Sequence, residues 1–167
     1  MDLLAYVERG GAIAYFLLVL NIIGFSVILW KSIVLYIAKS NILATSLEII
    51  DNLKMSNQSA NIPNIESKIS TKIQKLEFGL NSIKIIATIS PLLGLLGTVL
   101  GILSAFDAIS VSGLGDPTIF SSGISVALIT TVAGLIVAIP HYIAYNYFIG
   151  LLDSIEIALK EEVLKRV

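Results

Sequence analysis

Residues 117–152 read PTIFSSGISVALITTVAGLIVAIPHYIAYNYFIGLL and contain no Asp, Glu, Lys or Arg. This charge-free run lies between Asp116 and Asp153. A membrane-spanning helix needs roughly 20 mostly apolar residues. The run is therefore long enough to hold one complete span, which we place at about 123–146.

Two other parts of the chain share this property. Residues 10–30 and residues 85–106 also lack charged side chains. Each run is about as long as one membrane crossing requires. The sequence therefore predicts two more spans, at about 11–30 and 85–107, and three spans in all.

The composition of the whole chain supports this interpretation. Of its 167 residues, 56% are hydrophobic and 14% are charged, and the mean hydropathy is +0.90. Soluble domains are about 45–50% apolar and about 25% charged. The formal net charge is −1 and there is no cysteine, which argues against nucleic-acid binding, disulfides and thiolate metal sites. We expect an integral membrane protein that binds no metal and no cofactor.

The lysines and arginines predict the orientation. Seven lysines lie in residues 31–84 and three basic residues lie in the C-terminal tail, whereas Arg9 is the only basic residue of the other flanks. Basic residues favour the cytoplasmic side of a membrane. We therefore expect the N-terminus and the 107–123 loop outside, with residues 31–84 and 147–167 in the cytoplasm.

Both cytoplasmic regions carry apolar residues at helical spacing. Three sets of residues have this pattern: Leu43, Leu47, Ile50 and Leu53; Ile62, Ile65, Ile69, Ile73, Leu76, Leu80, Ile83 and Ala87; and Phe148, Leu152, Ile155, Leu159 and Val163. We predict a short helix, then a turn at 54–64, then one helix from about 65 to 108. The third span should also continue inward as a long helix. The fold class is thus all-α, a single membrane domain over 1–167 with two long helices that reach into the cytoplasm.

Apolar stripes in the cytoplasm require partners. We expect the inner ends of the long helices to form a collar between subunits, burying Ile65, Ile69, Leu76, Leu152, Ile155 and Leu159. Lys31 and Lys84 lie near the predicted inner interface and should attract anionic phospholipid head groups.

Enzyme signatures are absent from the sequence. His141 is the only histidine and has no HExxH motif, and Ser125 is not in a GxSxG elbow. Gly94, Gly97 and Gly101 lie in an apolar run without a following lysine, so they do not form a phosphate loop. Glycines at such spacing let membrane helices pack closely, and Gly134 is their expected counterpart in the third span. We predict no catalytic residue.

Two threonines lie at equal depth in the second and third spans. Thr98 is eight residues from Phe106 at the outer end of one span, and Thr131 is eight residues from Gly123 at the outer end of the other. Both hydroxyls should therefore lie about 12 Å below the outer surface. Either each bonds its own helix backbone, or the two serve a common ion pathway.

Pro91 and Pro140 also lie at similar depths, where each should kink its helix. Ser90 is placed to satisfy the carbonyl that Pro91 leaves without a donor. His141, with Tyr142, Tyr145, Asn146 and Tyr147, is typical of an aromatic belt at the inner interface, the alternative being a proton relay. Apart from Asp107 at the outer limit of the second span, no charged residue lies in any span, so this chain alone is a poor proton carrier.

Two stretches carry a resemblance to a known family. SPLLGLLGTVLGILSAF (90–106) and GISVALITTVAGLIVAIPHYIAYNYF (123–148) resemble the two signatures of the ExbB/TolQ/MotA family of proton-driven motor subunits. The predicted topology of three spans also matches this family. The compact size of the chain favours ExbB within the family. The resemblance implies a pentameric ring in the bacterial inner membrane, with the second and third spans lining a central channel and span one outside. It places Thr98 and Thr131 at the family's pore-threonine positions.

The resemblance also implies partners. Two single-span ExbD-type helices would occupy the channel and supply an Asp, and proton flow would drive a TonB-type protein that energises outer-membrane import. ExbB relatives often carry Glu where this chain has Val126, so no mechanism can use that carboxylate here. A TolQ-like subunit of the Tol-Pal envelope system and a passive membrane scaffold are the alternatives.

Overall fold

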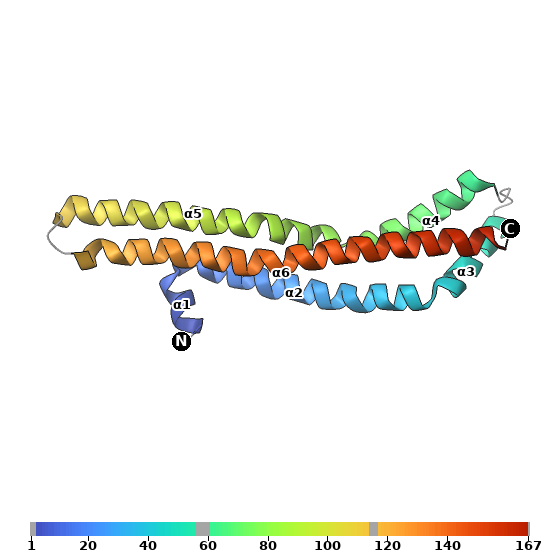
Figure 1. Cartoon of the computed structure of the whole chain (residues 1–167), viewed down its shortest axis with the longest axis horizontal. Helices are drawn as coiled ribbons and strands as arrows, with labels where there is room; N and C mark the ends of the chain where they lie inside the picture. The colour runs from blue at the N-terminus through green and yellow to red at the C-terminus, as the bar shows by residue number, and fades with distance from the viewer. Residues whose placement is uncertain (1–2, 56–60, 114–116, 167) are drawn as a thin grey trace. The chain divides into compact units, whose positions relative to one another are not determined.

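The fold is entirely helical over the residues that the computed structural model describes, which are 3–55, 61–113 and 117–166. This part of the chain forms six helices and no strand, so the all-α prediction is confirmed (Figure 1). The helices are α1 (Leu3–Arg9), α2 (Gly11–Ser40), α3 (Ile42–Met55), α4 (Ile62–Glu77), α5 (Leu80–Ser112) and α6 (Pro117–Leu164).

Three of these helices are long and apolar enough to cross a membrane. They are Gly11–Ser40, Leu80–Val111 and Phe120–Leu164. Each contains one of the spans predicted from the charge-free runs, whose exact limits stay predictions. The expected loop at 107–123 is shorter than predicted, because α5 continues to Ser112 and α6 begins at Pro117. Residues 114–116 of that loop lie outside the described residues.

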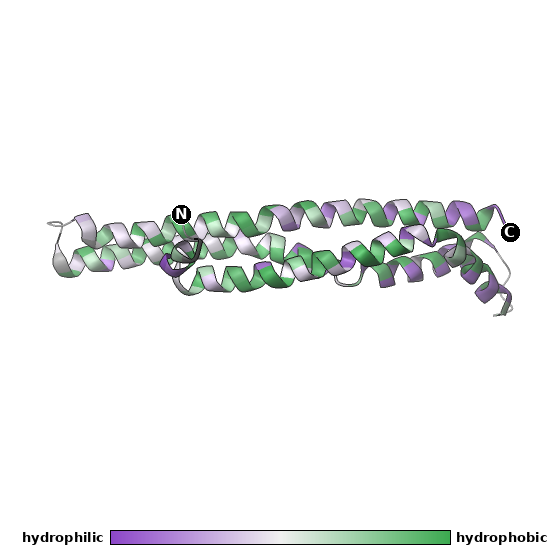
Figure 2. Cartoon of the chain, turned by 90° about the horizontal axis from the view of Figure 1, so that it is seen from below, coloured by the Kyte–Doolittle hydropathy of each residue, from purple (hydrophilic) through white to green (hydrophobic). Residues whose placement is uncertain are grey.

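The chain divides into two compact units, each built from parts of several helices. Unit 1 comprises Met1–Ser26 and Ser82–Ile143, and unit 2 comprises Val27–Asn81 and Ala144–Val167. In Figure 2 hydrophilic residues are frequent on the part of α6 near the C-terminus, which belongs to unit 2. Unit 1 holds most of the three charge-free runs and unit 2 holds most of the charged residues.

Unit 1 is held together by apolar side chains from three helices. Leu17 of α2, Ile86 of α5 and Val137 of α6 are buried against one another. Ile13, Leu20, Leu93 and Ala133 pack around this cluster. The outer faces of the same helices expose large apolar side chains such as Ile22, Leu92 and Leu128, which suits helices that meet lipid or other subunits.

Unit 2 buries the apolar stripes that were expected to meet between subunits. Ile65 and Ile69 of α4 and Leu152, Ile155 and Leu159 of α6 are each at most 3% exposed within a single chain. The predicted burial of these five side chains is confirmed and is already complete inside one chain. The collar between subunits stays a prediction. Leu76 is only half-buried.

The predicted continuous helix from about 65 to 108 is broken at Gly79. α4 ends at Glu77, Gly79 has φ of 89°, and α5 starts at Leu80. A φ in this left-handed region is readily adopted by glycine and ends a helix. The break removes the helical donor to the Leu76 carbonyl, and Lys31 Nζ replaces it with a hydrogen bond of 2.9 Å.

Lys31 is therefore not a lipid-binding residue, contrary to our prediction. Its side chain is buried, and its Nζ lies 4.7 Å from the centroid of the Trp30 ring. A Cβ atom at position 79 would lie 3.2 Å from Lys31 Cε and 3.3 Å from Trp30 Cζ3. The Lys31 side chain packs against the helix break at Gly79, and its ammonium group donates a hydrogen bond to the Leu76 carbonyl that the break leaves free.

The short helix α3 buries a face that matches the predicted one only in part. Leu53 is buried as predicted and Ile50 is half-buried, whereas Leu43 and Leu47 are exposed and Ser46 and Ile49 are buried instead. The Ser46 hydroxyl is satisfied locally, because it donates to the Leu43 carbonyl at 2.7 Å. Of the predicted turn at 54–64, residues 56–60 lie outside the described residues, and α4 already begins at Ile62.

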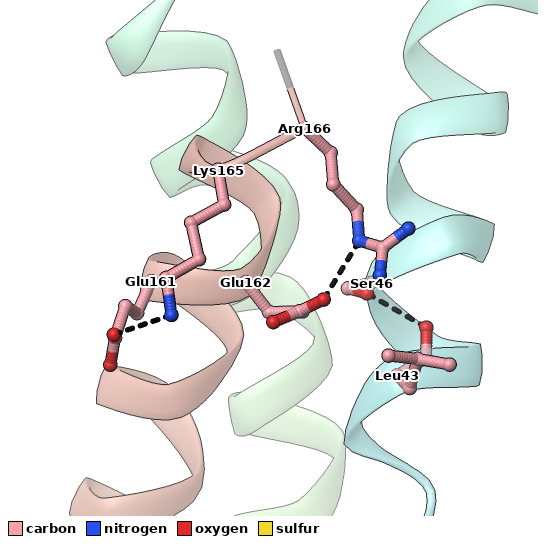
Figure 3. Close-up of polar contacts among 6 residues, drawn as sticks. All are labelled: Leu43, Ser46, Glu161, Glu162, Lys165 and Arg166. Carbon is pink, nitrogen blue, oxygen red and sulfur yellow. Dashed lines mark hydrogen bonds and ion pairs between the residues drawn. The ribbon is translucent and has the colours of Figure 1, made fainter.

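Two ion pairs lie at the C-terminal end of α6, and each joins two residues that are four positions apart (Figure 3). Lys165 Nζ lies 2.7 Å from Glu161, and Arg166 Nε lies 2.7 Å from Glu162. The hydrogen bond and the charge of Glu161 raise the pKa of Lys165. Such pairs are exposed and add little to stability, so unit 2 depends on its apolar core.

Replacing Ile69 by Asp tests the location of this core. The change removes a fully buried side chain and places a carboxylate among apolar neighbours, which should destabilise unit 2 by at least about 3 kcal/mol. Hydrogen exchange of the α4 amides should accelerate accordingly. Ser70→Asp adds the same charge at the neighbouring exposed position and should leave exchange nearly unchanged. Equal exchange in both variants would contradict an intrachain core.

Candidate functional site: a threonine pair between two closely packed helices

In unit 1, α5 and α6 run side by side in opposite directions (Figure 1). Gly94 lies against the Thr130 carbonyl, Thr131 and Gly134, and Gly134 lies against the Ser90 carbonyl. A Cβ atom at Gly94 would lie only 2.8 Å from the Thr130 oxygen. The two backbones thus approach too closely for any side chain at this position.

The close approach continues toward the α5–α6 connection. A Cβ atom at Gly101 would lie 2.6 Å from the Gly123 carbonyl oxygen. Gly97 lies against the side chain of Thr130. The three glycines of α5, with Gly123 and Gly134 of α6, therefore line one helix contact in which small residues permit backbone proximity.

Thr98 and Thr131 meet at the centre of this contact. Their Oγ1 atoms are hydrogen-bonded to each other, so the two hydroxyls lie at one level, as their spacing predicted. Thr98 Oγ1 also lies 3.2 Å from the Gly94 carbonyl oxygen and 3.1 Å from that of Ala127. Both side chains are half-buried.

The pair has more acceptors than hydrogens. Each threonine has one hydroxyl hydrogen and can accept further bonds. Thr131 Oγ1 also reaches the Gly94 carbonyl across the helix contact at 3.4 Å. The two hydrogens can therefore be arranged in several ways among the two hydroxyls and the carbonyls of Gly94 and Ala127. Such a pair can turn either a hydrogen or a lone pair toward an incoming group.

Thr130 behaves differently from its neighbour. Its side chain is fully buried, and its hydroxyl lies 3.0 Å from the carbonyls of Val126 and Ala127 in its own helix. This is the local backbone bonding that threonine commonly makes in helices. Thr130 is thus a packing residue against Gly97, whereas Thr131 bonds across to α5.

Both prolines lie inside continuous helices. Pro91 belongs to α5 and Pro140 to α6, and each helix continues through its proline. The Ser90 hydroxyl donates to the Ile86 carbonyl at 2.7 Å. It does not serve the Ala87 carbonyl, which is the one that Pro91 leaves without a donor, so that prediction was wrong.

His141 is not part of an exposed aromatic belt. Its side chain is fully buried, with its Nδ1 atom 2.7 Å from the Val137 carbonyl and its ring 5.2 Å from that of Phe25. Tyr142 and Tyr147 are exposed, as a belt would require. These tyrosines lie on other faces of α6 than His141, whose ring packs against α2 instead.

Val126 lines an open groove of about 340 Å³ in unit 1. Small residues form most of its wall, including Gly10, Gly97, Gly101 and Ser104. The position that often carries Glu in ExbB proteins is thus apolar and faces a groove without a carboxylate among its lining residues.

The geometry and the charge-free helices agree with what comparison of the sequence finds. Residues 37–161 match the MotA/TolQ/ExbB proton channel family. The chain belongs to this family. The match spans α3 to α5 and most of α6, and so includes both threonines of the pair.

Individual family members are similar over shorter stretches. The biopolymer transport protein ExbB of Aquifex aeolicus is 39% identical over 57% of this chain and 64% of its own length. The biopolymer transport protein exbB1 of Vibrio cholerae is 46% identical over 37% of this chain and 28% of its own length. The Tol-Pal system protein TolQ of Haemophilus influenzae is 38% identical over 53% and 39%. The matched segments thus cover less than two thirds of these relatives.

No role was predicted from the sequence for two polar residues of this MotA/TolQ/ExbB family member, Thr130 of α6 and Asn21 of α2. Leu17, Asn21 and Gly24 follow one another at steps of four and three, which places Asn21 on the buried face of α2. A lone amide on the apolar face of a predicted span was the available signal.

Replacing Gly94 by Ala tests the helix contact. The added methyl group meets backbone atoms, which cannot move aside, so α5 and α6 must separate and the protein should lose about 1–3 kcal/mol of stability. Gly150→Ala is the matched control in α6, because a Cβ atom there has nothing within 4 Å. It should stabilise by up to about 1 kcal/mol. Unfolding in mild detergent measures both, and an unchanged midpoint for Gly94→Ala would contradict the close contact.

Proposed function

We propose that this chain is the ring-forming, ExbB-like subunit of a proton-driven motor in the bacterial inner membrane. A single-span ExbD-type partner would supply an Asp, and the proton motive force would energise a TonB-type protein and outer-membrane import. The observation that carries the proposal is the Thr98–Thr131 hydroxyl pair, half-buried between two helices of a family that forms proton channels.

The energetics of a carboxylate at membrane depth explain why hydroxyls suit this role. An ionised Asp in a span is costly unless it finds water or hydrogen-bond donors. With an ionised Asp, Thr131 can donate its hydrogen to the carboxylate while Thr98 donates to a backbone carbonyl. With a protonated Asp, the same oxygen can accept. A lysine would instead hold the carboxylate as an ion pair and stop turnover.

The pair's own hydrogen bonds fit this exchange. Each hydroxyl already has carbonyl acceptors at 3.1–3.4 Å. A hydroxyl hydrogen that rotates away from one acceptor therefore meets another. Neither state of the Asp then leaves a buried hydroxyl without a partner. Because Val126 replaces the acidic residue often found in relatives, the partner's Asp is the only acid that the proposal requires.

Assembly into a ring gives the exposed apolar faces a use. Large apolar side chains are exposed on α2, α5 and α6, among them Ile33, Leu92, Leu95 and Ile136. We place α2 on the lipid side and α5 and α6 around a central channel in a homo-pentamer. Proline residues at 91 and 140 would let the channel helices flex there. The N-terminus would lie in the periplasm and the C-terminus in the cytoplasm, with Lys84 near phospholipid head groups.

A TolQ-like role in the Tol-Pal envelope system is the second candidate. It is favoured by a specific observation, because TolQ proteins match this chain at 38–40% identity, close to the values for several ExbB proteins. Co-purification distinguishes the two, since an ExbB-like subunit should retain a TonB-system partner and a TolQ-like subunit a Tol-Pal partner. A chain that retains no single-span acidic partner would instead be a passive scaffold.

Removing the hydroxyls should block proton flow in the assembled complex. Thr98→Val and Thr131→Val both keep the side-chain shape. Thr131→Val removes the hydroxyl that donates to the partner's carboxylate, and Thr98→Val removes the hydroxyl that hydrogen-bonds to Thr131, at a cost of about 1–3 kcal/mol each. Proton flux into proteoliposomes that contain the partner should therefore fall at least about fivefold in each variant.

Thr130→Val is the matched control for this experiment. It removes the adjacent hydroxyl, which bonds only within α6, and should leave the flux near that of the unmodified complex. Unchanged flux in a Thr98→Val, Thr131→Val double variant that still assembles would refute the proposed role of the pair.

A further inference from the structure

Large apolar side chains are exposed on α2 around Lys31, the residue at which its charge-free run ends. Each of the following five is at least 50% exposed: Leu29, Trp30, Ile33, Tyr36 and Ile37. All of them belong to unit 2. A contiguous exposed apolar patch marks a contact with another protein or with a membrane. This surface, which we call the α2 patch, therefore requires an occupant.

The α2 patch occupies one side of the helix. Ile33 lies four residues after Leu29 and three before Tyr36, and residues at these spacings are neighbours on a helix surface. Lys31 is two residues from Ile33 and points to the other side. It shares the buried side of α2 with Leu35, which lies four residues further on. The charge that ends the run is thus absent from the patch.

Lys31 is bound inside the protein. Its side chain is 1% exposed, and its Nζ donates a hydrogen bond of 2.9 Å to the Leu76 carbonyl. A lysine held in this way presents no charge to lipid. The next charged residue of α2 is Lys39, whose side chain is exposed. The exposed side of α2 therefore carries no charge between the start of the helix at Gly11 and Lys39.

The α2 patch continues the exposed side of a membrane-spanning helix. The whole of α2, Gly11–Ser40, is long and apolar enough to cross a membrane. Large side chains at steps of seven residues, or about two helical turns, are exposed along it: Tyr15, Ile22, Leu29 and Tyr36. The patch is thus continuous with a surface that already suits lipid.

The length of this exposed side fits a bilayer. It runs from Tyr15 to Ile37, which is about 33 Å at 1.5 Å per residue, and the hydrocarbon core of a bilayer is about 30 Å thick. If the lipid contact ended at Trp30, it would be only about 22 Å long. The distance along α2 from Gly11 to Lys39 is about 42 Å, close to the thickness of about 40–45 Å of a bilayer with its head groups. Lipid contact through the α2 patch therefore matches both dimensions.

We propose that membrane lipid covers the α2 patch as far as Ile37, and that Lys39, not Lys31, meets the lipid head groups at this end of α2. The head groups then lie about 12 Å further along α2 than the end of its charge-free run indicates. Tyr36 lies near them, at a level where tyrosine is enriched in membrane proteins. Lys39 can pack its methylene stem on the patch and extend its ammonium group into the head groups.

Lipid contact is confined to one side of unit 2. α4 exposes Lys75 and Glu77, the two sequence neighbours of Leu76. Charged side chains are costly in the hydrocarbon region, so these two residues require water or another subunit. Lipid contact at Tyr36 rests on the placement of α2 on the lipid side in the proposed function and on no other part of it. Its test can therefore fail while the proposed motor role stands.

Trp30 is the only tryptophan, so tryptophan fluorescence can be assigned to one position of the full chain. The protein is placed in phosphatidylcholine vesicles whose acyl chains carry bromine, which quenches tryptophan on contact. The double variant Trp30→Phe, Tyr36→Trp moves the probe toward the Lys39 end of the patch. Its emission should fall in brominated vesicles relative to unbrominated ones and should resist iodide added to the water. Trp30 in the unmodified chain should behave in the same way.

Two more variants that also carry Trp30→Phe are the matched references. Ile22→Trp probes the middle of the exposed side of α2 and should be quenched by bromine. Ile157→Trp probes an exposed position of α6 in unit 2 and should lose no emission to bromine. Iodide quenching at position 36, or protection from both quenchers because protein covers the patch, would overturn the proposal. If position 22 also escapes bromine, the placement of α2 on the lipid side fails as well.

Discussion

The close approach of α5 and α6 determines the geometry of everything at the candidate site. Glycines on both helices bring the backbones so near that a single added methyl at position 94 would meet the Thr130 carbonyl. This proximity places the Thr98 and Thr131 hydroxyls within hydrogen-bonding distance of each other and of carbonyls on both helices. A larger separation would leave each threonine bonded only to its own helix, as Thr130 is.

The charge-free helices give these hydroxyls their importance. In an apolar surrounding, a polar group has few alternatives to the hydrogen bonds that the protein supplies, and leaving one unmade is costly. Unit 1 meets this constraint at the threonine pair, whose hydroxyls are satisfied within the chain and can rearrange. Among the described residues, His141 Nε2 and Asn21 Oδ1 have no hydrogen-bond partner. The arrangement of the threonine pair suits the proposed exchange with an acid from a partner.

The sequence predicted the helices better than it predicted which faces meet. Charge-free length located three long helices, and counting residues inward located two hydroxyls at one level. The stripe from Phe148 to Val163 was also correctly expected to be buried. These features depend on local composition and on helix geometry, which a sequence carries directly.

The errors arose where tertiary contacts decide the outcome. The apolar spacing predicted one continuous helix through Gly79, but the helix is broken there. The Leu76 carbonyl that the break leaves free accepts a hydrogen bond from Lys31, which is distant in the sequence. Five of the predicted collar residues are buried within one chain, and periodicity cannot distinguish such partners from partners in another chain. His141 was assigned to a surface belt because its neighbours are aromatic, yet the space at Gly24 admits its ring to the interior.

In the proposed complex the threonine pair faces the acid-bearing helix of a partner. The chain has no cysteine, so Thr131→Cys introduces one thiol, which can be paired with a cysteine placed beside the Asp of the single-span partner. We expect disulfide cross-linking in membranes for Thr131→Cys and none for Ile22→Cys on the exposed face of α2. Cross-linking from position 22 but not from position 131 would contradict it.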